Sequence, residues 1–286
     1  MTRLCFFVVL RDFEIDYAEK IFSPLIRECE SVCRIHCQIK FFIQTDDSSK
    51  LKISTSFEAA CVSVIFIDYC SLSRARNIAL ETSSHDCNYF MFLDCNSFVS
   101  SDSFLEIEER VLAGFKIMAG VARFQGLHFR AADENFEGDV GSLTRYRLLR
   151  SPYVWSYVFK ADCVDGIFFD ENIGIGSNGI VQCGEDIIFL ADTLRILGLA
   201  AFEFNNKIVV DKPMRPEGLV KQKLYSFGQG AIWRRLLGSY RNVFGLPVLL
   251  LHIFLFFGNG FRHFIVGGSD GKKVFVGRVK GFMYRC

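Results

Sequence analysis

The chain has 286 residues, enough to bury one large core and to carry an appendage. Its formal net charge of +1 gives no global reason to expect nucleic acid as a partner. Half of the residues are hydrophobic and 31 are Phe, which is high for a freely soluble protein and indicates a segment that contacts a membrane. The eleven cysteines include no CxxC pair, so we expect reduced thiols in a cytosolic compartment.

Three of the cysteines, Cys29, Cys33 and Cys37, are spaced four residues apart. On a continuous helix they would form one stripe, most simply a buried face lined by thiols. A metal or iron–sulfur site is the alternative, although no known ligand spacing matches it well.

The first hundred residues alternate between short apolar runs and helical spacing. We expect four strands, each buried on both faces: Leu4–Leu10, Ile39–Ile43, Val62–Ile67 and Tyr89–Leu93. Helical spacing runs from Tyr17 to Cys33 and from Arg74 to Thr82. This alternation predicts an α/β fold with a mostly parallel central sheet flanked by helices. Ligands of such sheets bind beyond the carboxyl ends of the strands, where polar residues stand at 44–49 and 94–96.

The middle of the chain is less regular. We expect strands at Phe115–Phe124 and at Val154–Phe159, and an acidic loop at Ala131–Gly141. A helix should begin at Gly184-Glu185-Asp186 and end at Gly198, which suits a helix terminus.

Five segments, read in order, resemble motifs of the family 2 glycosyltransferases, which have the Rossmann-like GT-A fold. They are Ile43–Ser49, Ser71–Ala79, Phe90–Asn96, Cys183–Phe189 and Tyr225–Gly230, the last followed by Arg234 and Arg235. Each motif alone is modest, but their order and spacing together make a strong signal. The resemblance covers about residues 3 to 240 and implies a GT-A domain over 1–240 and a separate tail over 241–286.

The resemblance also implies roles for individual residues. The nucleotide-sugar donor would be bound by Asp46, Asp47, Arg76, Asn77 and Asp94. A divalent cation, Mn²⁺ or Mg²⁺, would neutralise the diphosphate, and its ligands would be Asp94, Asn96 and Asp211. The catalytic pair would be Asp186, as the base that deprotonates the acceptor hydroxyl, and Glu185 in support. Trp155 is assigned to the acceptor side.

Simpler interpretations stay open for these groups. The polar cluster after residue 44 could be a solvated turn, and Arg76 could make only a surface ion pair. Glu185 and Asp186 could merely favour a helix N-terminus. Asp94 is harder to dismiss, because a carboxylate at the end of an apolar strand is costly without a partner.

Two residues depart from the family pattern. Asn96 stands where the second acid of the Asp-x-Asp motif is expected, and an amide oxygen is a weaker ligand than a carboxylate. Asp211 occupies the region where family members often carry a His, and it could restore the charge lost at Asn96.

The tail is apolar and basic. From Arg234 onward there are nine Lys or Arg residues and one acid, Asp270. Val243–Phe257 is a borderline length for a membrane span, and Arg262 and His263 disfavour extending it. We therefore expect a hydrophobic helical segment that lies in the membrane plane with its cations on anionic lipid. The alternative is an apolar helix packed on the catalytic domain or on a second copy.

The favoured interpretation is an inverting, hexosyltransferase-type enzyme that acts in bacterial cell-surface polysaccharide biosynthesis. Its partners would be a nucleotide-diphosphate sugar, a glycan or lipid-linked acceptor and the membrane surface, with no nucleic acid. Its location would be the cytoplasmic face of the inner (plasma) membrane, peripheral or monotopic. The alternative, favoured by Asn96, is a non-catalytic glycosyltransferase-like nucleotide-binding subunit of an assembly complex. A nucleotidyltransferase would need a Gly- and Lys/Arg-rich N-terminal loop, which we do not find.

Overall fold

The computed structural model describes residues 1–31, 34–46, 58–124, 145–149, 153–212 and 218–284. The chain forms two compact units. The first comprises Met1–Asn135, Tyr153–Phe168 and Ala200–Met214, and the second comprises Phe136–Pro152, Phe169–Leu199 and Arg215–Cys286.

The first unit is built on one eight-stranded sheet with the order β3-β2-β1-β4-β7-β6-β8-β5. The strands are β1 (Arg3–Arg11), β2 (His36–Gln44), β3 (Val62–Ile67), β4 (Tyr89–Asp94), β5 (Phe98–Val99), β6 (Ile117–Phe124), β7 (Tyr157–Lys160) and β8 (Phe202–Lys212). The strands from β3 to β4 are parallel, and so are β6 and β8, whereas β7 and β5 pair antiparallel with their neighbours. The mostly parallel α/β sheet expected from the sequence is confirmed.

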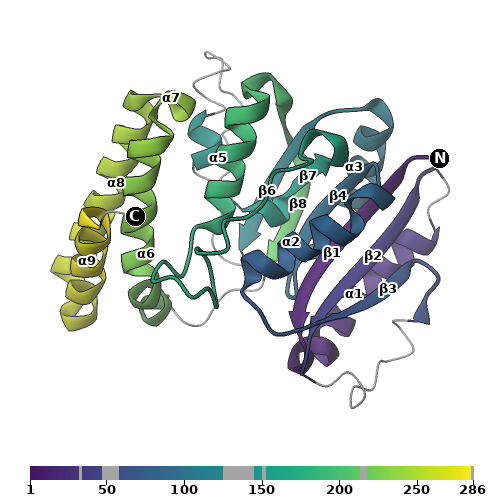
Figure 1. Cartoon of the computed structure of the whole chain (residues 1–286), viewed down its shortest axis with the longest axis horizontal. Helices are drawn as coiled ribbons and strands as arrows, with labels where there is room; N and C mark the ends of the chain where they lie inside the picture. The colour runs from purple at the N-terminus through teal and green to yellow at the C-terminus, as the bar shows by residue number, and fades with distance from the viewer. Residues whose placement is uncertain (32–33, 47–57, 125–144, 150–152, 213–217, 285–286) are drawn as a thin grey trace. The chain divides into compact units, whose positions relative to one another are not determined.

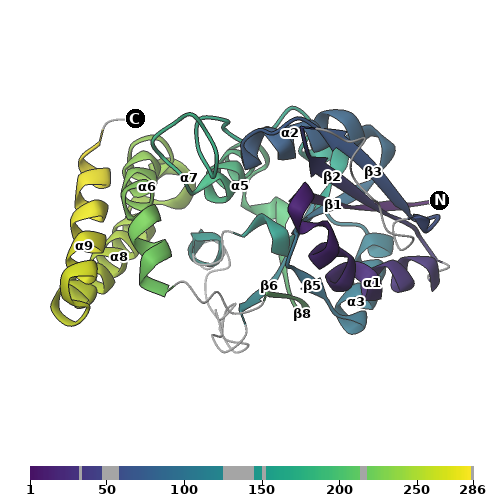
Figure 2. The same cartoon turned by 90° about the horizontal axis from the view of Figure 1, so that it is seen from below.

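Both faces of this sheet are covered by helices (Figures 1 and 2). Helices α1 (Ile15–Ser31) and α3 (Ser101–Ala113) cover one face, and α2 (Leu72–Ser83) covers the other. The alternation of strand side chains explains the two cores. Phe6 of β1 joins α1 and α3 in the first core, whereas Phe7 stacks on Phe90 and meets Phe92 on the α2 side. Because β1 is buried on both faces, its apolar run is continuous.

The expected strands differ in how well they hold. Val62–Ile67 is β3 with the expected bounds, but it is a partly buried edge strand and not one buried on both faces. The expected strand at Val154–Phe159 is divided. Val154–Ser156 forms a 3-10 turn that carries Trp155, and the strand β7 begins only at Tyr157. The expected acidic loop at 131–141 lies outside the described residues.

The expected thiol stripe on one helix is wrong, because α1 ends at Ser31 and Cys37 belongs to β2. Cys29 and Cys37 are nevertheless both buried, while Cys33 lies outside the described residues. Hydrogen bonds with the Cys37 and Cys61 thiols, together with burial, raise the pKa of Cys29. The Cys29 thiol is therefore a protonated part of the core.

The second unit is mainly helical, with a segment of turns and one isolated β-bridge, Ile173 to Val181, before its longer helices. It contains α5 (Glu185–Leu197), α6 (Gly218–Ser239), α7 (Arg241–Phe244), α8 (Leu246–Val266) and α9 (Gly268–Met283). Helices α6 and α9 approach so closely that only glycine fits at their contact. A Cβ at Gly230 would overlap the Arg278 carbonyl, and one at Gly281 would overlap the Phe227 carbonyl. Small residues of this kind allow two helix backbones to touch.

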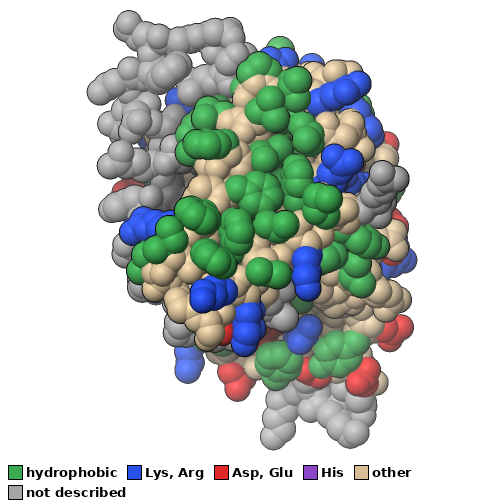
Figure 3. Space-filling model, turned by 90° about the vertical axis from the view of Figure 1, so that its left-hand side faces the viewer, with side chains coloured by type: hydrophobic (Ala, Val, Ile, Leu, Met, Phe, Trp, Pro, Cys, Tyr) green, Lys and Arg blue, Asp and Glu red, His purple; other side chains and the backbone are tan. Residues whose placement is uncertain are grey.

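Helix α8 is longer than the sequence suggested. It continues through Arg262 and His263 to Val266, although we expected the apolar segment to end before Gly258-Asn259-Gly260. Among the described residues it is the one helix that is long and apolar enough to cross a membrane by length and composition alone. Most of its apolar stretch is exposed, and Figure 3 shows a continuous hydrophobic surface over α8 and α9 with Lys and Arg at its margins.

Candidate functional site

The carboxyl ends of β1, β2 and β3 bring together polar side chains from three separate segments. The Tyr69 hydroxyl, beyond β3, donates a 2.7 Å hydrogen bond to the Asp12 carboxylate, beyond β1. This hydrogen bond lowers the pKa of Asp12 and raises the pKa of Tyr69. Asp46, beyond β2, is exposed and raises the pKa of Tyr69 further through its charge. Asp47 lies outside the described residues.

Asp94 is the last residue of β4, at the same edge of the sheet. A tight turn follows it, in which the Ser97 backbone N–H donates to the Asp94 carbonyl at 2.9 Å. The Asp94 N–H in turn donates to the Ser97 hydroxyl at 3.3 Å. Because these two hydrogen bonds fix the Asp94 backbone, its carboxylate has a defined position at the end of β4. Its side chain is 24% exposed, so one part of the carboxylate reaches solvent.

Arg76 approaches Asp94 from helix α2. Its Nη2 lies 3.2 Å from Asp94 Oδ1, and its guanidinium carbon lies 5.9 Å from the centroid of the Phe92 ring. The Arg76 side chain is only 3% exposed. A buried guanidinium requires a charged or polar partner, so this is an internal ion pair and not the surface pair considered from the sequence. The neighbouring Asn77 is buried as well.

Lys212 approaches Asp94 from the opposite side, at the end of β8. Its Nζ pairs with Asp94 Oδ2, and its side chain is completely buried. The ammonium also lies 4.3 Å from the centroid of the Trp155 ring, a cation–π contact. Trp155 is itself buried. The structure gives this ring contacts with Lys212 and with the Tyr153 ring, and its expected place on the acceptor side stays a prediction.

Asp211 faces away from this cluster. Adjacent residues of a strand point to opposite faces of a sheet, and Lys212 is the one that contacts Asp94. The Asp211 carboxylate is held instead by Arg123 of β6, at 2.5 Å from Nε and 2.6 Å from Nη2. This bidentate pair raises the pKa of Arg123. Lys212, and not Asp211, is thus the residue that β8 brings to Asp94.

The residues around Asp94 do not fit a divalent cation. Cations already occupy both carboxylate oxygens of Asp94, Asn96 contributes no charge, and Asp211 is engaged by Arg123. Within the described ranges, no group of three or more His, Cys, Asp or Glu side chains is arranged to hold a metal ion. Burial, followed by the charge of Glu14, raises the pKa of the nearby Cys95 thiol to about 12.

The catalytic pair expected from the sequence lies in the second unit, at the start of α5. Gly184 precedes the helix in a left-handed conformation with φ of 93°, and a Cβ there would overlap the Ile232 side chain. Only glycine satisfies both conditions. Glu185 is buried, whereas Asp186 is partly exposed. Of the two carboxylates, Asp186 is therefore the one that a bound molecule can reach.

Sequence reasoning missed Asp12, Tyr69 and Lys212. The sequence signal for Asp12 was present, since it follows a buried strand just as Asp46 and Asp94 do. Lys212 had only a weak signal: it directly follows Asp211, the residue expected to bind the metal. Its role depends on a side-chain contact between residues 118 positions apart, which local sequence does not reveal.

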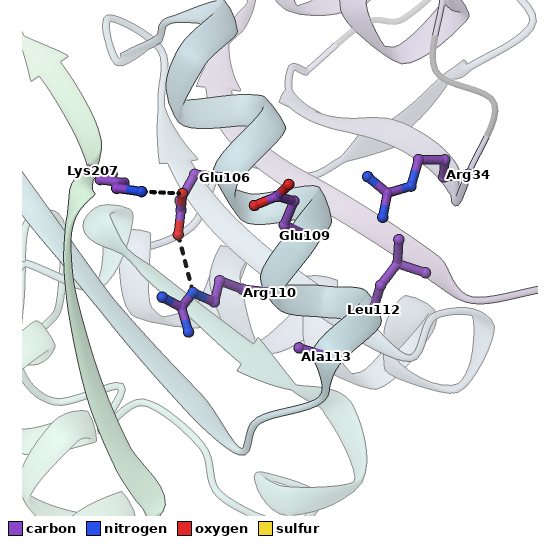
Figure 4. Close-up of a pocket in the computed structure, with 7 residues that line it drawn as sticks. All are labelled: Arg34, Glu106, Glu109, Arg110, Leu112, Ala113 and Lys207. Atoms are coloured by element: carbon purple, nitrogen blue, oxygen red, sulfur yellow. Dashed lines mark hydrogen bonds and ion pairs between the residues drawn. The ribbon is translucent and has the colours of Figure 1, made fainter.

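A separate hollow of about 470 Å³ lies between α3 and β8 (Figure 4). Its Glu106 pairs with Arg110 at 3.0 Å and with Lys207 at 3.6 Å. No residue expected to bind donor or metal lines this hollow. Its charged side chains largely neutralise one another, so it is not a candidate site.

No family model matches the chain, and no curated protein does. Solved structures share its fold. The crystal structure of S. aureus TarS 1–349 aligns with a TM-score of 0.65 and 12% identity over 99% of this chain and 80% of that chain. The same protein in complex with UDP-GlcNAc aligns with a TM-score of 0.57 and 11% identity over 83% and 67%.

A third structure is glucosyl-3-phosphoglycerate synthase from Mycobacterium tuberculosis in complex with Mn²⁺, UDP and phosphoglyceric acid. It aligns with a TM-score of 0.52 and 15% identity, over 82% of this chain and 78% of that chain. At these identities the comparisons establish the fold, which is the expected GT-A-like α/β architecture. Function must be argued from the site.

Proposed function

We propose that this chain is a glycosyltransferase that takes a sugar from a nucleotide-diphosphate donor. The observation that carries the proposal is the ion pair between Asp94 and the buried Arg76, at the carboxyl edge of a GT-A-like sheet. Ligands of open α/β sheets bind at this edge. Neighbours with the same fold were solved with UDP-GlcNAc and with UDP, which supports UDP as the nucleotide to test first.

The proposed reaction is a single displacement of the hexosyltransferase type. Asp186 takes the proton of the acceptor hydroxyl as its oxygen attacks the anomeric carbon. The bond from that carbon to the diphosphate oxygen breaks, and the nucleoside diphosphate leaves with the bonding electrons. One displacement from the face opposite the leaving group inverts the configuration at that carbon. We propose a glycan or lipid-linked acceptor and a role in bacterial cell-surface polysaccharide biosynthesis.

The divalent cation of such a reaction, expected here as Mn²⁺ or Mg²⁺, offsets the charge of the leaving diphosphate. The structural neighbours solved with Mn²⁺ or Mg²⁺ and UDP are consistent with such a cofactor. In this chain its expected first ligand is Asp94, and the metal would have to displace Lys212 from that carboxylate. The proposed reaction therefore includes no metal-bound step.

We expect UDP to bind at the sheet edge marked by Asp46 and Asp94. Asp46→Ala should weaken UDP binding by roughly tenfold, because it removes one charge-assisted hydrogen bond to the nucleoside. Calorimetry measures the dissociation constants. Asp102→Ala is the matched control, since Asp102 is an exposed carboxylate in the first turn of α3. Equal UDP affinity in both variants would place the nucleoside elsewhere, and no UDP binding by the wild type would remove the main support for the proposal.

We further propose that the protein is peripheral or monotopic at the cytoplasmic face of the inner (plasma) membrane. One side of α8 presents large apolar side chains that are 49% to 73% exposed, namely Leu250, Phe254, Phe261 and Ile265. Exposed cations of α8 and α9, including Arg262, Lys272 and Lys280, accompany this apolar surface. An apolar face bordered by cations matches an anionic lipid surface.

Replacing Leu250, Phe254 and Phe261 together by Gln should release the protein from anionic vesicles in a flotation assay. The loss should be more than tenfold in partition coefficient, because three exposed apolar side chains no longer enter the lipid. These substitutions are a better test than deleting the chain from Phe244 onward. Phe244 is buried, and the deletion would also remove α9, which packs against α6. The control replaces exposed Leu105, Leu112 and Ile196 by Gln. Unchanged flotation of the α8 variant would contradict the membrane proposal.

A non-catalytic nucleotide-binding subunit is the second candidate, and Asn96 in place of an acid favours it. Incubation with a radiolabelled nucleotide sugar and membrane-derived acceptors discriminates the two. If the wild type transfers or slowly hydrolyses the donor and Asp186→Asn abolishes this turnover, the chain is the enzyme. Donor binding without turnover supports the non-catalytic subunit.

A further inference from the structure

We propose that the Lys212 ammonium, together with Arg76, occupies the place of the divalent cation at Asp94, so that donor binding and transfer by this chain are independent of metal. The inference rests on the proposed function and concerns the same site. The cluster contains two fixed cations, Lys212 and Arg76, and one carboxylate. Its formal charge is therefore positive before any ligand binds.

A divalent cation would be repelled by this cluster. A metal at Asp94 must share a carboxylate whose two oxygens already contact an ammonium and a guanidinium, and like charges at such distances repel strongly in a partly buried site. The other two metal ligands expected from the sequence do not compensate. Asn96 is neutral, and the Asp211 carboxylate belongs to Arg123 on the other face of the sheet.

Lys212 is also held firmly in its place. Its side chain is completely buried, its Nζ contacts Asp94, and the Trp155 ring stands against the ammonium at 4.3 Å. Leaving Asp94 would cost the ammonium both of these interactions, and it would leave a buried charge without its partner. Lys212 is therefore a resident cation and not a flexible surface lysine such as Lys207 of the same strand, whose side chain is 79% exposed.

This arrangement can perform the electrostatic task of the metal. A donor diphosphate that binds where Asp94 reaches solvent meets a cluster of net positive charge. The positive charges are in position before the leaving group develops its own charge, which is the condition for effective electrostatic stabilisation. Asp94 then acts by holding Arg76 and Lys212, and not as a metal ligand.

The test measures UDP binding by calorimetry and donor turnover, in EDTA and in Mn²⁺, with the full-length protein. We expect the wild-type dissociation constant and turnover to agree within about twofold between the two conditions. Lys212→Met retains the buried stem and removes the charge. This substitution should weaken UDP binding by at least about tenfold in EDTA. Because the ammonium no longer contacts Asp94, the variant should also bind Mn²⁺ more tightly than the wild type, as measured by electron paramagnetic resonance.

Lys207→Met is the matched control, because it makes the same substitution at an exposed position of β8. It should leave both constants unchanged. Wild-type UDP affinity that collapses in EDTA and returns with Mn²⁺ would overturn the metal-independent site but leave the proposed glycosyltransferase intact. Absence of UDP binding in both conditions would overturn the proposed function, and the role of Lys212 with it. The wild-type comparison decides the matter even if Lys212→Met fails to fold.

Discussion

Asp94→Asn should lower donor turnover by about 10²–10³-fold, the usual effect of losing one preorganised electrostatic element. The amide keeps the shape of the side chain but cannot hold two cations in place. Arg76 and Lys212 would then face each other without a carboxylate between them, although both are buried. We expect weaker UDP binding and a measurable loss of stability as well, because uncompensated buried charges are costly.

Steady-state kinetics and a thermal melt of the same preparation separate these two effects. The control is Asp86→Asn, which breaks a carboxylate–ammonium pair in the 3-10 turn Ser84–Asp86, just before the start of the same strand. Asp86 lies 2.9 Å from the Lys40 ammonium, which lowers the pKa of Asp86, and it has no assigned role in the reaction. Wild-type turnover in a folded Asp94→Asn protein would remove Asp94 from the site.

The parts of the fold that the sequence revealed are those set by local pattern. Buried parallel strands such as Leu4–Leu10 within β1 are continuous apolar runs, so their limits are visible in the chain. Trp155 was placed in a strand because apolar residues surround it, yet the turn that holds it is fixed by tertiary packing. The continuation of α8 through Gly258 and Gly260 was also missed because it depends on tertiary packing: Gly260 lies against Arg278 and Phe275 of α9.

The candidate site divides in the same way. Asp46 and Asp94 were found because each stands at the end of an apolar strand. Arg76 was found because it lies in the segment Ser71–Ala79, which resembles a family motif. Lys212 was not found, because which of two adjacent strand residues faces Asp94 depends on the pairing of β8 within the sheet. The sequence assigned Asp211 to the site, whereas the structure places its neighbour Lys212 there. A shift of one residue along a strand exchanges the faces of the sheet.

Asp186→Asn should lower turnover by about 10²–10⁴-fold while UDP affinity stays nearly unchanged, because the amide retains the shape of the side chain but cannot accept the proton of the acceptor. Asp186 is partly exposed in the first turn of α5, where the helix dipole favours the ionised carboxylate. Buried apolar residues such as Ile188 and Leu190 anchor the helix in the core.

Glu185→Gln is the comparison that isolates this effect. The two carboxylates are adjacent on the helix and therefore point about 100° apart, and Glu185 is the buried one. Its substitution should cost less turnover and more stability than that of Asp186. Single-turnover kinetics with saturating donor measure the chemical step directly, and calorimetry with UDP measures the donor site. Loss of UDP binding in Asp186→Asn would make Asp186 part of the donor site, and an unchanged chemical step would transfer the role of base to another group.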